Sequence, residues 1–434
     1  MNKRNIRWVS CWMAGALALA GAWSAAAQSG GETLVLTVEG PLTPAFAAYI
    51  ERGLARAERD KAVVVILQLN TPGGGIDLMD QIVAVIRGSP VPVVVYVAPR
   101  GANAGSAGTV ITLAGHAAAM APETIIGAAS PVGGQGEDLG STLESKVKEA
   151  LKAKVRALAA GRSAEAIALA EATIDTARAA TAQEAHAAGL VDFLAADVPD
   201  LLRQLDGFTV EVDGQPRTLV TDGRRVTELP MNLLETALNL LTNPNVVFLL
   251  LALGAQAILI ELSSPGGWVA GFVGVASLLL AFYGLGVLPV NWFGILFVVL
   301  AFVLFVMEIY ATTHGGLAAA GTGSLIVGAL VLFNSPGSPD FFRVNVPLVV
   351  ITSIVLAAGF VTLVTFALRA QRRPIAVGVE RLIGQEGEVR TPNAVQVAGE
   401  LWSAEPTEGA LEVGQKVEVA AIKGLTLLVR KKKG

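Results

Sequence analysis

The sequence predicts three folds in succession: an α/β domain built on a parallel sheet, a polytopic helical membrane region, and a small all-β barrel. Apolar, β-branched runs alternate with helical patterns over residues 32–225. Five apolar stretches follow over residues 246–368, each near the ~20 residues that a membrane span needs. Short strand-like runs separated by glycines then fill residues 379–434.

The composition limits the classes of protein that the chain can belong to. The 434 residues are 53% hydrophobic and 16% charged, and the mean hydropathy of +0.58 is too high for a soluble protein of this length. The net charge of −4 argues against the positively charged surface that nucleic-acid-binding proteins need. One cysteine, Cys11, and three histidines provide no Cys/His metal cluster, so we expect neither a metal nor another cofactor.

Residues 1–27 have the pattern of a secretory signal peptide. Three basic residues lie among the first seven, an apolar run follows over 8–23, and small residues at 25–27 suit cleavage. The alternative is an uncleaved anchor, but the apolar run is short for a bilayer span. We therefore expect the α/β domain, residues 28–225, to lie outside the cytoplasm, followed by a linker over residues 226–245.

Strands and helices alternate along the α/β domain. Apolar runs predict strands at residues 34–40, 63–69, 91–98 and 124–128. Helical patterns lie between and after them, at residues 44–59, 76–87, 106–115, 141–160 and 181–189. An apolar strand start follows the helix that ends at Gly189. Two further runs, at 208–212 and 217–221, are typical of a closing hairpin.

Two glycine-rich turns, TPGGG at 71–75 and GANAGSAG at 101–108, follow two of these strands. Ligands of open α/β sheets bind beyond the carboxyl ends of the strands, where both turns would lie. Ser106 is expected in the first turn of a helix, where backbone N–H groups are unpaired and the helix dipole is positive. A serine facing free amides has the nucleophile and the oxyanion hole that acyl transfer requires. The alternative is a serine that only caps its helix.

The apolar block predicts five membrane spans, at Val246–Leu262, Trp268–Leu288, Trp292–Ala311, Gly316–Phe333 and Val346–Leu368. The fourth is rich in glycine and alanine, so a re-entrant or interfacial segment is the alternative for it. Glu261 and Glu308 fall near span ends, and we interpret them as interfacial residues rather than as a proton path.

Four strand-like runs predict the C-terminal barrel, at residues 387–391, 395–402, 415–421 and 425–430. Glycines lie in the turns between them. The basic residues at 431–433 are interpreted as a solvated tail rather than as a nucleic-acid contact.

The order of these parts resembles the long form of the NfeD family, which are membrane-bound serine proteases with a ClpP-class domain. The resemblance covers essentially the whole chain. It rests on NTPGGG at 70–75, AGSAGT at 104–109, MAPETIIGAASPVG at 120–133 and GELWSA at 399–404. It implies an α/β ClpP/crotonase-like protease domain and an OB-like C-terminal barrel.

The resemblance also implies a catalytic Ser–Lys dyad, with Ser106 as nucleophile and Lys146 as general base. Following the ClpP-class pattern, the oxyanion donors are the backbone amides of Gly74 and Ala107. The glycine-rich segment 133–141 precedes the lysine helix and is expected to become ordered when substrate binds.

A histidine base does not fit the sequence. The stretch where ClpP carries its histidine corresponds to residues 127–134, which contain none. His116 lies at the far end of the serine's own helix, about 15 Å away. A Ser–His arrangement would need His186 to fold back onto the site. A lysine can replace histidine if burial lowers its pKa from about 10.4 toward neutrality.

The resemblance implies an endopeptidase of the inner cell membrane that cuts hydrophobic peptide or membrane-protein segments. It further implies a stomatin-type membrane partner and a homodimer or higher oligomer. Two alternatives stay open. A non-catalytic membrane scaffold that binds peptides would not need Ser106 and Lys146. A crotonase-type acyl-CoA enzyme would need an acidic residue beside the oxyanion hole.

The predicted topology places the two soluble parts on opposite sides of the membrane. A signal peptide directs the protease domain out of the cytoplasm. Because five spans are an odd number of crossings, the barrel then lies in the cytoplasm. Arg369, Arg372 and Arg373 follow the fifth span, and basic residues beside span ends favour the cytoplasm.

Overall fold

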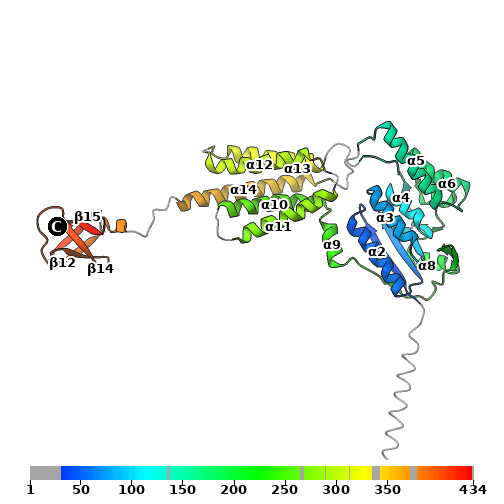
Figure 1. The fold of residues 1–434 in the computed structure, drawn as a ribbon, viewed down its shortest axis with the longest axis horizontal. Helices are drawn as coiled ribbons and strands as arrows, with labels where there is room; N and C mark the ends of the chain where they lie inside the picture. Colours follow the sequence, from blue (N-terminus) through cyan, green and yellow to red (C-terminus); the bar gives the residue numbers. More distant parts are fainter. Residues whose placement is uncertain are drawn as a thin grey trace, which may run out of the picture. The chain divides into compact units, whose positions relative to one another are not determined.

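The computed structural model describes residues 31–133, 137–263, 268–288, 290–311, 313–334, 343–371 and 379–432. The predicted signal peptide therefore lies outside the described residues. The chain divides into two compact units, residues 1–357 and 358–434. The first holds the α/β domain and most of the membrane helices, and the second ends in the barrel (Figure 1).

A six-stranded parallel sheet with the order β11-β1-β2-β3-β5-β8 forms the centre of the α/β domain. Its strands are β1 (Thr33–Glu39), β2 (Val64–Asn70), β3 (Val93–Val97), β5 (Ala117–Met120), β8 (Phe193–Leu194) and β11 (Val226–Glu228). β3 is buried at every position, because apolar clusters cover both faces of the sheet. Uniform burial explains why its sequence, VVVYV, shows no alternation.

The helices of this domain are α2 (Pro44–Arg59), α3 (Ile76–Arg87), α4 (Ala107–Ala114), α5 (Ser141–Leu158), α6 (Ala164–Asp175), α7 (Ala182–Ala187), α8 (Val198–Leu205) and α9 (Leu233–Leu240). The predicted limits of α2 and α3 are confirmed. The hydroxyl of Thr43 caps α2 by accepting a hydrogen bond from Phe46 N–H, and Pro44 follows it directly.

Smaller elements complete the domain. β4 (Asn103–Gly105), β6 (Ile125–Gly127) and β7 (Ala179–Thr181) form a three-stranded sheet, and β9 (Thr209–Val212) pairs with β10 (Gln215–Thr218) as the predicted hairpin.

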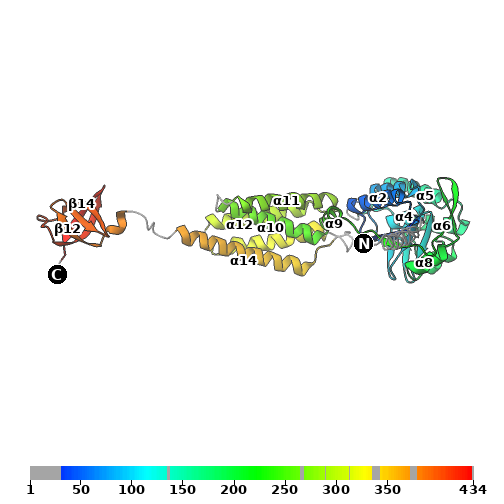
Figure 2. The same cartoon turned by 90° about the horizontal axis from the view of Figure 1, so that it is seen from below.

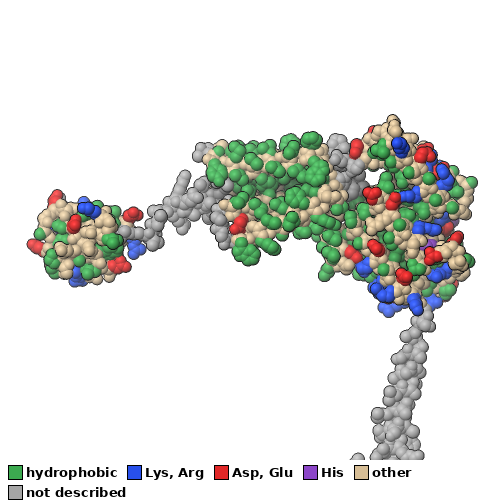
Figure 3. Space-filling view, in the orientation of Figure 1, with side chains coloured by type: hydrophobic (Ala, Val, Ile, Leu, Met, Phe, Trp, Pro, Cys, Tyr) green, Lys and Arg blue, Asp and Glu red, His purple; other side chains and the backbone are tan. Residues whose placement is uncertain are grey.

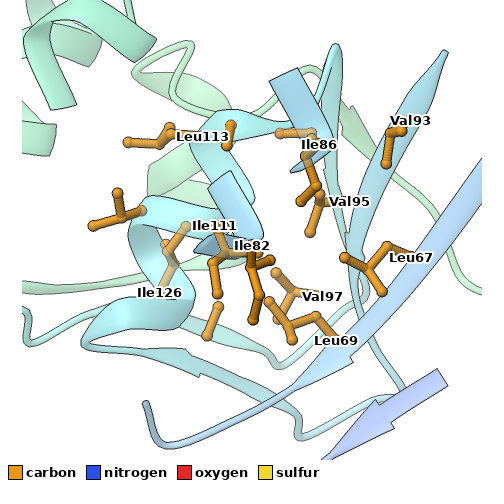
Figure 4. Packing of buried hydrophobic residues seen from close by; sticks show 14 of the residues in the cluster. Leu67, Leu69, Ile82, Ile86, Val93, Val95, Val97, Ile111, Leu113 and Ile126 are labelled. Atoms are coloured by element: carbon orange, nitrogen blue, oxygen red, sulfur yellow. The ribbon is translucent and has the colours of Figure 1, made fainter. Parts of the chain in front are cut away.

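One layer of side chains sets where the two glycine-rich turns lie (Figure 4). β2, β3, α3 and α4 pack their buried apolar residues into one cluster, which includes Leu67, Leu69, Val93, Val95, Val97, Ile82, Ile86, Ile111 and Leu113. Because β2 and β3 are adjacent and parallel, their carboxyl ends lie side by side. The turn after each strand therefore opens at the same edge of the sheet.

The sequence patterns did not predict two strands of the main sheet, β5 and β11. β5 has the sequence AAAM, and alanine has a low intrinsic preference for strands. β11 lies in the segment expected to be a linker, yet it pairs in parallel with β1, so the sheet extends beyond residue 225. Both pairings join residues that are distant in sequence, which local patterns do not encode.

Helices occur at all five predicted membrane spans: α10 (Pro244–Ser263), α11 (Val269–Val287), α12 (Phe293–Tyr310), α13 (Gly316–Phe333) and α14 (Val346–Gln371). Among the residues that the structure describes, three apolar stretches are long enough to cross a membrane, namely Pro244–Leu262, Val269–Val287 and Gly316–Phe333. Two described stretches, Phe293–Glu308 and Val346–Thr362, are shorter apolar helices. Hydrophobic side chains cover the visible face of these helices, whereas charged side chains gather on the α/β domain (Figure 3).

The membrane region contains two hairpins of similar design, α10 with α11 and α12 with α13 (Figures 1 and 2). The Glu261 carboxylate accepts hydrogen bonds from the N–H groups of Trp268 (3.1 Å) and Gly271 (3.2 Å). The Glu308 carboxylate accepts from Gly315 (2.8 Å) and Ala318 (3.1 Å). In both hairpins the donors follow the glutamate by seven and ten residues. Each glutamate therefore stabilises the start of the next helix.

The C-terminal unit ends in a closed barrel with the strand order β12-β13-β14-β16-β15. Its strands are β12 (Glu386–Thr391), β13 (Ala394–Val397), β14 (Glu400–Pro406), β15 (Lys416–Lys423) and β16 (Thr426–Lys431). The prediction of one strand over 395–402 is wrong. Ala398 and Gly399 both have positive φ, 53° and 89°, and form a tight turn between β13 and β14.

Candidate active site

The turns after β2 and β3 are bound to each other through their backbones. Thr71 N–H donates to the Asn103 carbonyl (2.6 Å), and Gly105 N–H donates to the Thr71 carbonyl (2.9 Å). The side chain of Asn70 accepts a third hydrogen bond, from Asn103 N–H (3.1 Å). Two loops that are about thirty residues apart in the chain therefore form one rigid wall.

Ser106 lies on a strained turn between β4 and α4. Its φ of 52° and ψ of −120° fall in a region that costs a non-glycine residue about 1–3 kcal/mol. The turn is fixed by Ser106 N–H, which donates to the Gly127 carbonyl (2.9 Å). The fully buried hydroxyl of Thr109 donates to Ala104 O (2.9 Å) and accepts from Gly127 N–H (3.0 Å). A serine held on a strained strand-to-helix turn presents its hydroxyl outward from the sheet.

The glycine loop approaches Ser106 as closely as two backbones can. A Cβ added to Gly73 would lie 2.6 Å from Ser106 Cβ and 3.1 Å from its Oγ, and Gly73 has a φ of +122°. The Gly73 N–H is already used, because it donates to Thr71 Oγ1 (3.0 Å). Neither the Gly74 nor the Ala107 amide donates to another described residue. Both remain available for the predicted oxyanion role.

Ser106, Gly74 and Ala107 line one cavity of about 760 Å³. Most of its other side chains are apolar, and they include Leu42, Ile76, Met79, Val110 and Leu151. No Asp or Glu is among the described lining residues. The cavity therefore suits an apolar side chain placed beside the serine.

Lys146 lies on the first two turns of α5, where its side chain is exposed. The other three lysines of α5 contact carboxylates: Lys148 with Glu144 (2.8 Å), Lys152 with Glu149 (2.9 Å), and Lys154 with Asp80. Within the described residues, Lys146 has no hydrogen bond or ion pair, and no lysine of α5 forms a hydrogen bond with Ser106. The structure does not bring the predicted dyad together, and the pairing of Ser106 with Lys146 stays a prediction.

The histidines do not supply a base in place of the lysine. His116 Nδ1 accepts a hydrogen bond from Val93 N–H (3.0 Å), and burial lowers the pKa of His116 to about 4. Its role is to hold the end of α4 against β3 in neutral form. His186 lies in the last turn of α7, and among the described residues it forms no hydrogen bond with Ser106. Across the described residues, no three His, Cys, Asp or Glu side chains form a group able to hold a metal.

Three models of one family match successive parts of the chain. NfeD1b, N-terminal domain, matches residues 32–211; the NfeD integral membrane domain matches 245–367; and the NfeD-like C-terminal, partner-binding domain matches 379–431. Membrane-bound protease PH1510 of Pyrococcus horikoshii is 34% identical over 411 residues, covering 91% of this chain and 92% of the relative. Membrane protein NfeD1b of Bacillus subtilis is 29% identical over 334 residues, with 76% and 72% covered.

A solved structure matches the α/β domain. It is a lysine-to-alanine variant of the 1510-N membrane-bound stomatin-specific protease in complex with a substrate peptide. It is 31% identical, covers 48% of this chain and 96% of that chain, and has a TM-score of 0.45. The family models and the identity to PH1510 extend over all three parts of the chain. The chain therefore belongs to the NfeD family and is one of its membrane-bound serine proteases.

Proposed function

We propose that this protease cleaves apolar peptide segments with Ser106 as nucleophile, Lys146 as general base and the Gly74 and Ala107 amides as oxyanion donors. The observation that carries the proposal is the strained Ser106 turn. It is in direct contact with Gly73 and shares an apolar cavity with two amides that have no acceptor among the described residues. A peptide-binding scaffold would gain nothing from such strain.

The proposed reaction follows the usual order of acyl transfer. The Ser106 hydroxyl attacks the scissile carbonyl carbon while its proton passes to the amine of Lys146. The oxyanion that forms accepts hydrogen bonds from the Gly74 and Ala107 amides. Lys146 then returns the proton to the leaving amine, and water hydrolyses the acyl-enzyme. Each step moves one proton and needs no cofactor.

Lys146 must be neutral to act as a base, and its side chain is exposed in this structure. The next residue, Val147, already packs against the core. Closure of the start of α5 over the cavity would bring the lysine amine among apolar side chains such as Leu42 and Met79. Such burial lowers the pKa of a lysine. We infer that substrate, by drawing α5 inward, completes the site.

The substrate and partner are inferred from the cavity and from the relatives. Apolar lining favours an apolar side chain beside the scissile bond. The related 1510-N protein is described as specific for stomatin. We propose a stomatin-type membrane protein as substrate or as partner of the C-terminal domain, whose family model is a partner-binding domain. A homodimer or higher oligomer is part of the same proposal.

We further propose that the α/β domain over residues 28–225 lies outside the cytoplasm and that the barrel over 379–434 lies inside. Support comes from the basic residues of the signal-like N-terminus and from Arg369, Arg372 and Arg373, which follow the predicted fifth span in the sequence. Five spans separate the two parts in this topology.

Two substitutions of Ser106 distinguish the chemical role of its hydroxyl from the strain of its backbone. Ser106→Ala and Ser106→Gly should both lower peptidase activity by at least about 10³-fold, because the nucleophile is lost. Ser106→Gly should also be more stable than Ser106→Ala, with a free energy of unfolding higher by on the order of 1 kcal/mol, because glycine tolerates this backbone conformation. Thermal unfolding in detergent measures the difference, and equal stabilities would contradict the strain.

Lys146→Ala should abolish cleavage of a hydrophobic peptide nearly as completely as Ser106→Ala does, because no Asp, Glu or His is among the described residues that line the cavity. Lys148→Ala is the matched control on the same helix, since Lys148 pairs with Glu144 instead. It should retain most activity. Initial rates on one peptide compare the variants, and wild-type turnover by Lys146→Ala would reject the dyad.

Two neighbouring glycines provide a matched test of the oxyanion loop. A Cβ at Gly74 would lie 2.6 Å from Leu42 Cβ, whereas a Cβ at Gly75 meets nothing within 4 Å. Gly74→Ala should therefore move the donor amide and lower kcat by about 10²–10³-fold. Gly75→Ala should behave like wild type. Similar kcat values for the two variants would remove Gly74 from the proposed site.

Single cysteines test the proposed topology. Gln215 and Ser403 are both exposed, in the β9–β10 hairpin and in the barrel respectively. In a Cys11→Ser background, Gln215→Cys should react with a membrane-impermeant maleimide on spheroplasts, because the α/β domain faces outward. Ser403→Cys should react only after lysis. Labelling at Ser403→Cys before lysis would place the barrel outside.

A further inference from the structure

Helix α9 has the opposite polarity to a helix on the surface of a soluble domain. Its outward residues include Leu233, Leu234 and Leu240, which are 91%, 67% and 55% exposed. Its inward face carries Glu235, which is 6% exposed. Leu233 and Leu240 are seven residues apart and lie on one side of the helix. Water is therefore an unfavourable environment for the outward side.

The inward side is held firmly on the α/β domain. Arg52 of α2 donates two hydrogen bonds to the Glu235 carboxylate, at 2.6 and 2.7 Å, and one to the Pro230 carbonyl, at 2.9 Å. The Arg52 guanidinium lowers the pKa of Glu235, so this carboxylate stays charged. Glu235 also accepts from Asn232 N–H in a capping box that starts the helix. These contacts fix α9 with its leucines pointing away from α2.

The chain places this leucine face next to the membrane helices. α10 begins at Pro244, four residues after Leu240, and four residues span at most about 14 Å. The end of α9 also touches α11, because a Cβ added to Gly284 would lie 2.4 Å from the Leu241 carbonyl oxygen. The stretches Pro244–Leu262 and Val269–Val287 are long enough to cross a membrane. The leucines are therefore within reach of the bilayer surface at this end of the two helices.

The same helix contacts the active-site loop. Thr43 Oγ1 donates to Asn239 Oδ1 of α9 (3.1 Å). The preceding residue, Leu42, lines the cavity, and its N–H donates to the Gly73 carbonyl (2.9 Å). A short path of direct contacts therefore leads from the exposed leucine helix to the loop that faces Ser106.

We propose that α9 lies in the interfacial layer of the bilayer, with its three leucines in lipid, and holds the Ser106 cavity at the membrane surface. Exposed leucines bind the apolar part of that layer, and α9, with the sequence LLETALNL, carries no basic residue that would bind an anionic headgroup. Neutral phosphatidylcholine is therefore sufficient, and anionic lipid is not required. For the peptidase proposed above, on which this consequence rests, the substrate is a peptide bond close to the bilayer surface.

The location of α9 can be measured without catalysis. The full chain with Leu233→Cys in a Cys11→Ser background is labelled with an environment-sensitive fluorophore and reconstituted into phosphatidylcholine vesicles. Nitroxide-bearing lipid should quench it severalfold more than the same fluorophore at Val220→Cys. Val220 is the matched control, because it is 50% exposed in the α/β domain. Leu240→Cys repeats the test if Leu233→Cys does not fold.

Two results would overturn the proposal. Equal quenching at Leu233→Cys and Val220→Cys would show that α9 faces water. Shielding from nitroxide lipid, together with energy transfer between labelled copies, would show that a second copy of the chain covers the leucines. Because the Ser106→Ala variant should give the same quenching as the active protein, a failure of the proposed chemistry would not affect this measurement.

Discussion

The close contact between Gly73 and Ser106 is the constraint on which the site depends. No side chain fits between them, since an added Cβ at Gly73 would lie 2.6 Å from Ser106 Cβ. Ser106 has a backbone conformation that costs free energy, and the surrounding hydrogen bonds offset this cost. Thr71 and Thr109, both fully buried, direct their hydroxyls to the two loops and keep them in place.

Ser106 is held in place by these contacts, whereas Lys146 is exposed and has no hydrogen bond or ion pair among the described residues. The turns after β2 and β3 position the proposed nucleophile and donor amides, whereas the proposed base is on a helix whose start does not line the cavity. In the proposed mechanism, the closure that brings Lys146 to Ser106 also removes it from water. Substrate binding and activation of the base then occur together, because burial favours the neutral amine. A protease built this way stays inactive until a suitable segment fills its apolar cavity.

Two glutamates of the membrane region bind backbone amides within that region. Glu261 and Glu308 each accept two backbone N–H groups at the start of the next helix, which matters where lipid offers no hydrogen bonds. α9 follows the same rule at the membrane surface, with Glu235 paired to Arg52 and leucines turned outward. The two hairpins share one spacing of glutamate and donor amides, a repeat that the hydropathy pattern alone does not reveal.

Several elements can be predicted from the sequence because their causes are local. Thr43 and Pro44 define the start of α2, the glycines after β2 and β3 define the turns, and hydropathy locates the membrane helices. The strand AAAM at 117–120 depends on the tertiary fold instead, because the position beside β3, rather than alanine's own preference, imposes it.

The same division applies to the site. Residue type and the glycine-rich turns indicated Ser106, and the family resemblance implied the Gly74 and Ala107 amides. All three residues line one cavity. The positive φ of Ser106 and the use of the Gly73 amide by Thr71 depend on contacts between separate loops. The separation of Lys146 from Ser106 also depends on contacts between distant segments. The amphipathic pattern of a helix is the same whether a lysine on it faces water or a nucleophile. Local pattern fixes which groups are available, and packing between distant segments decides which of them meet.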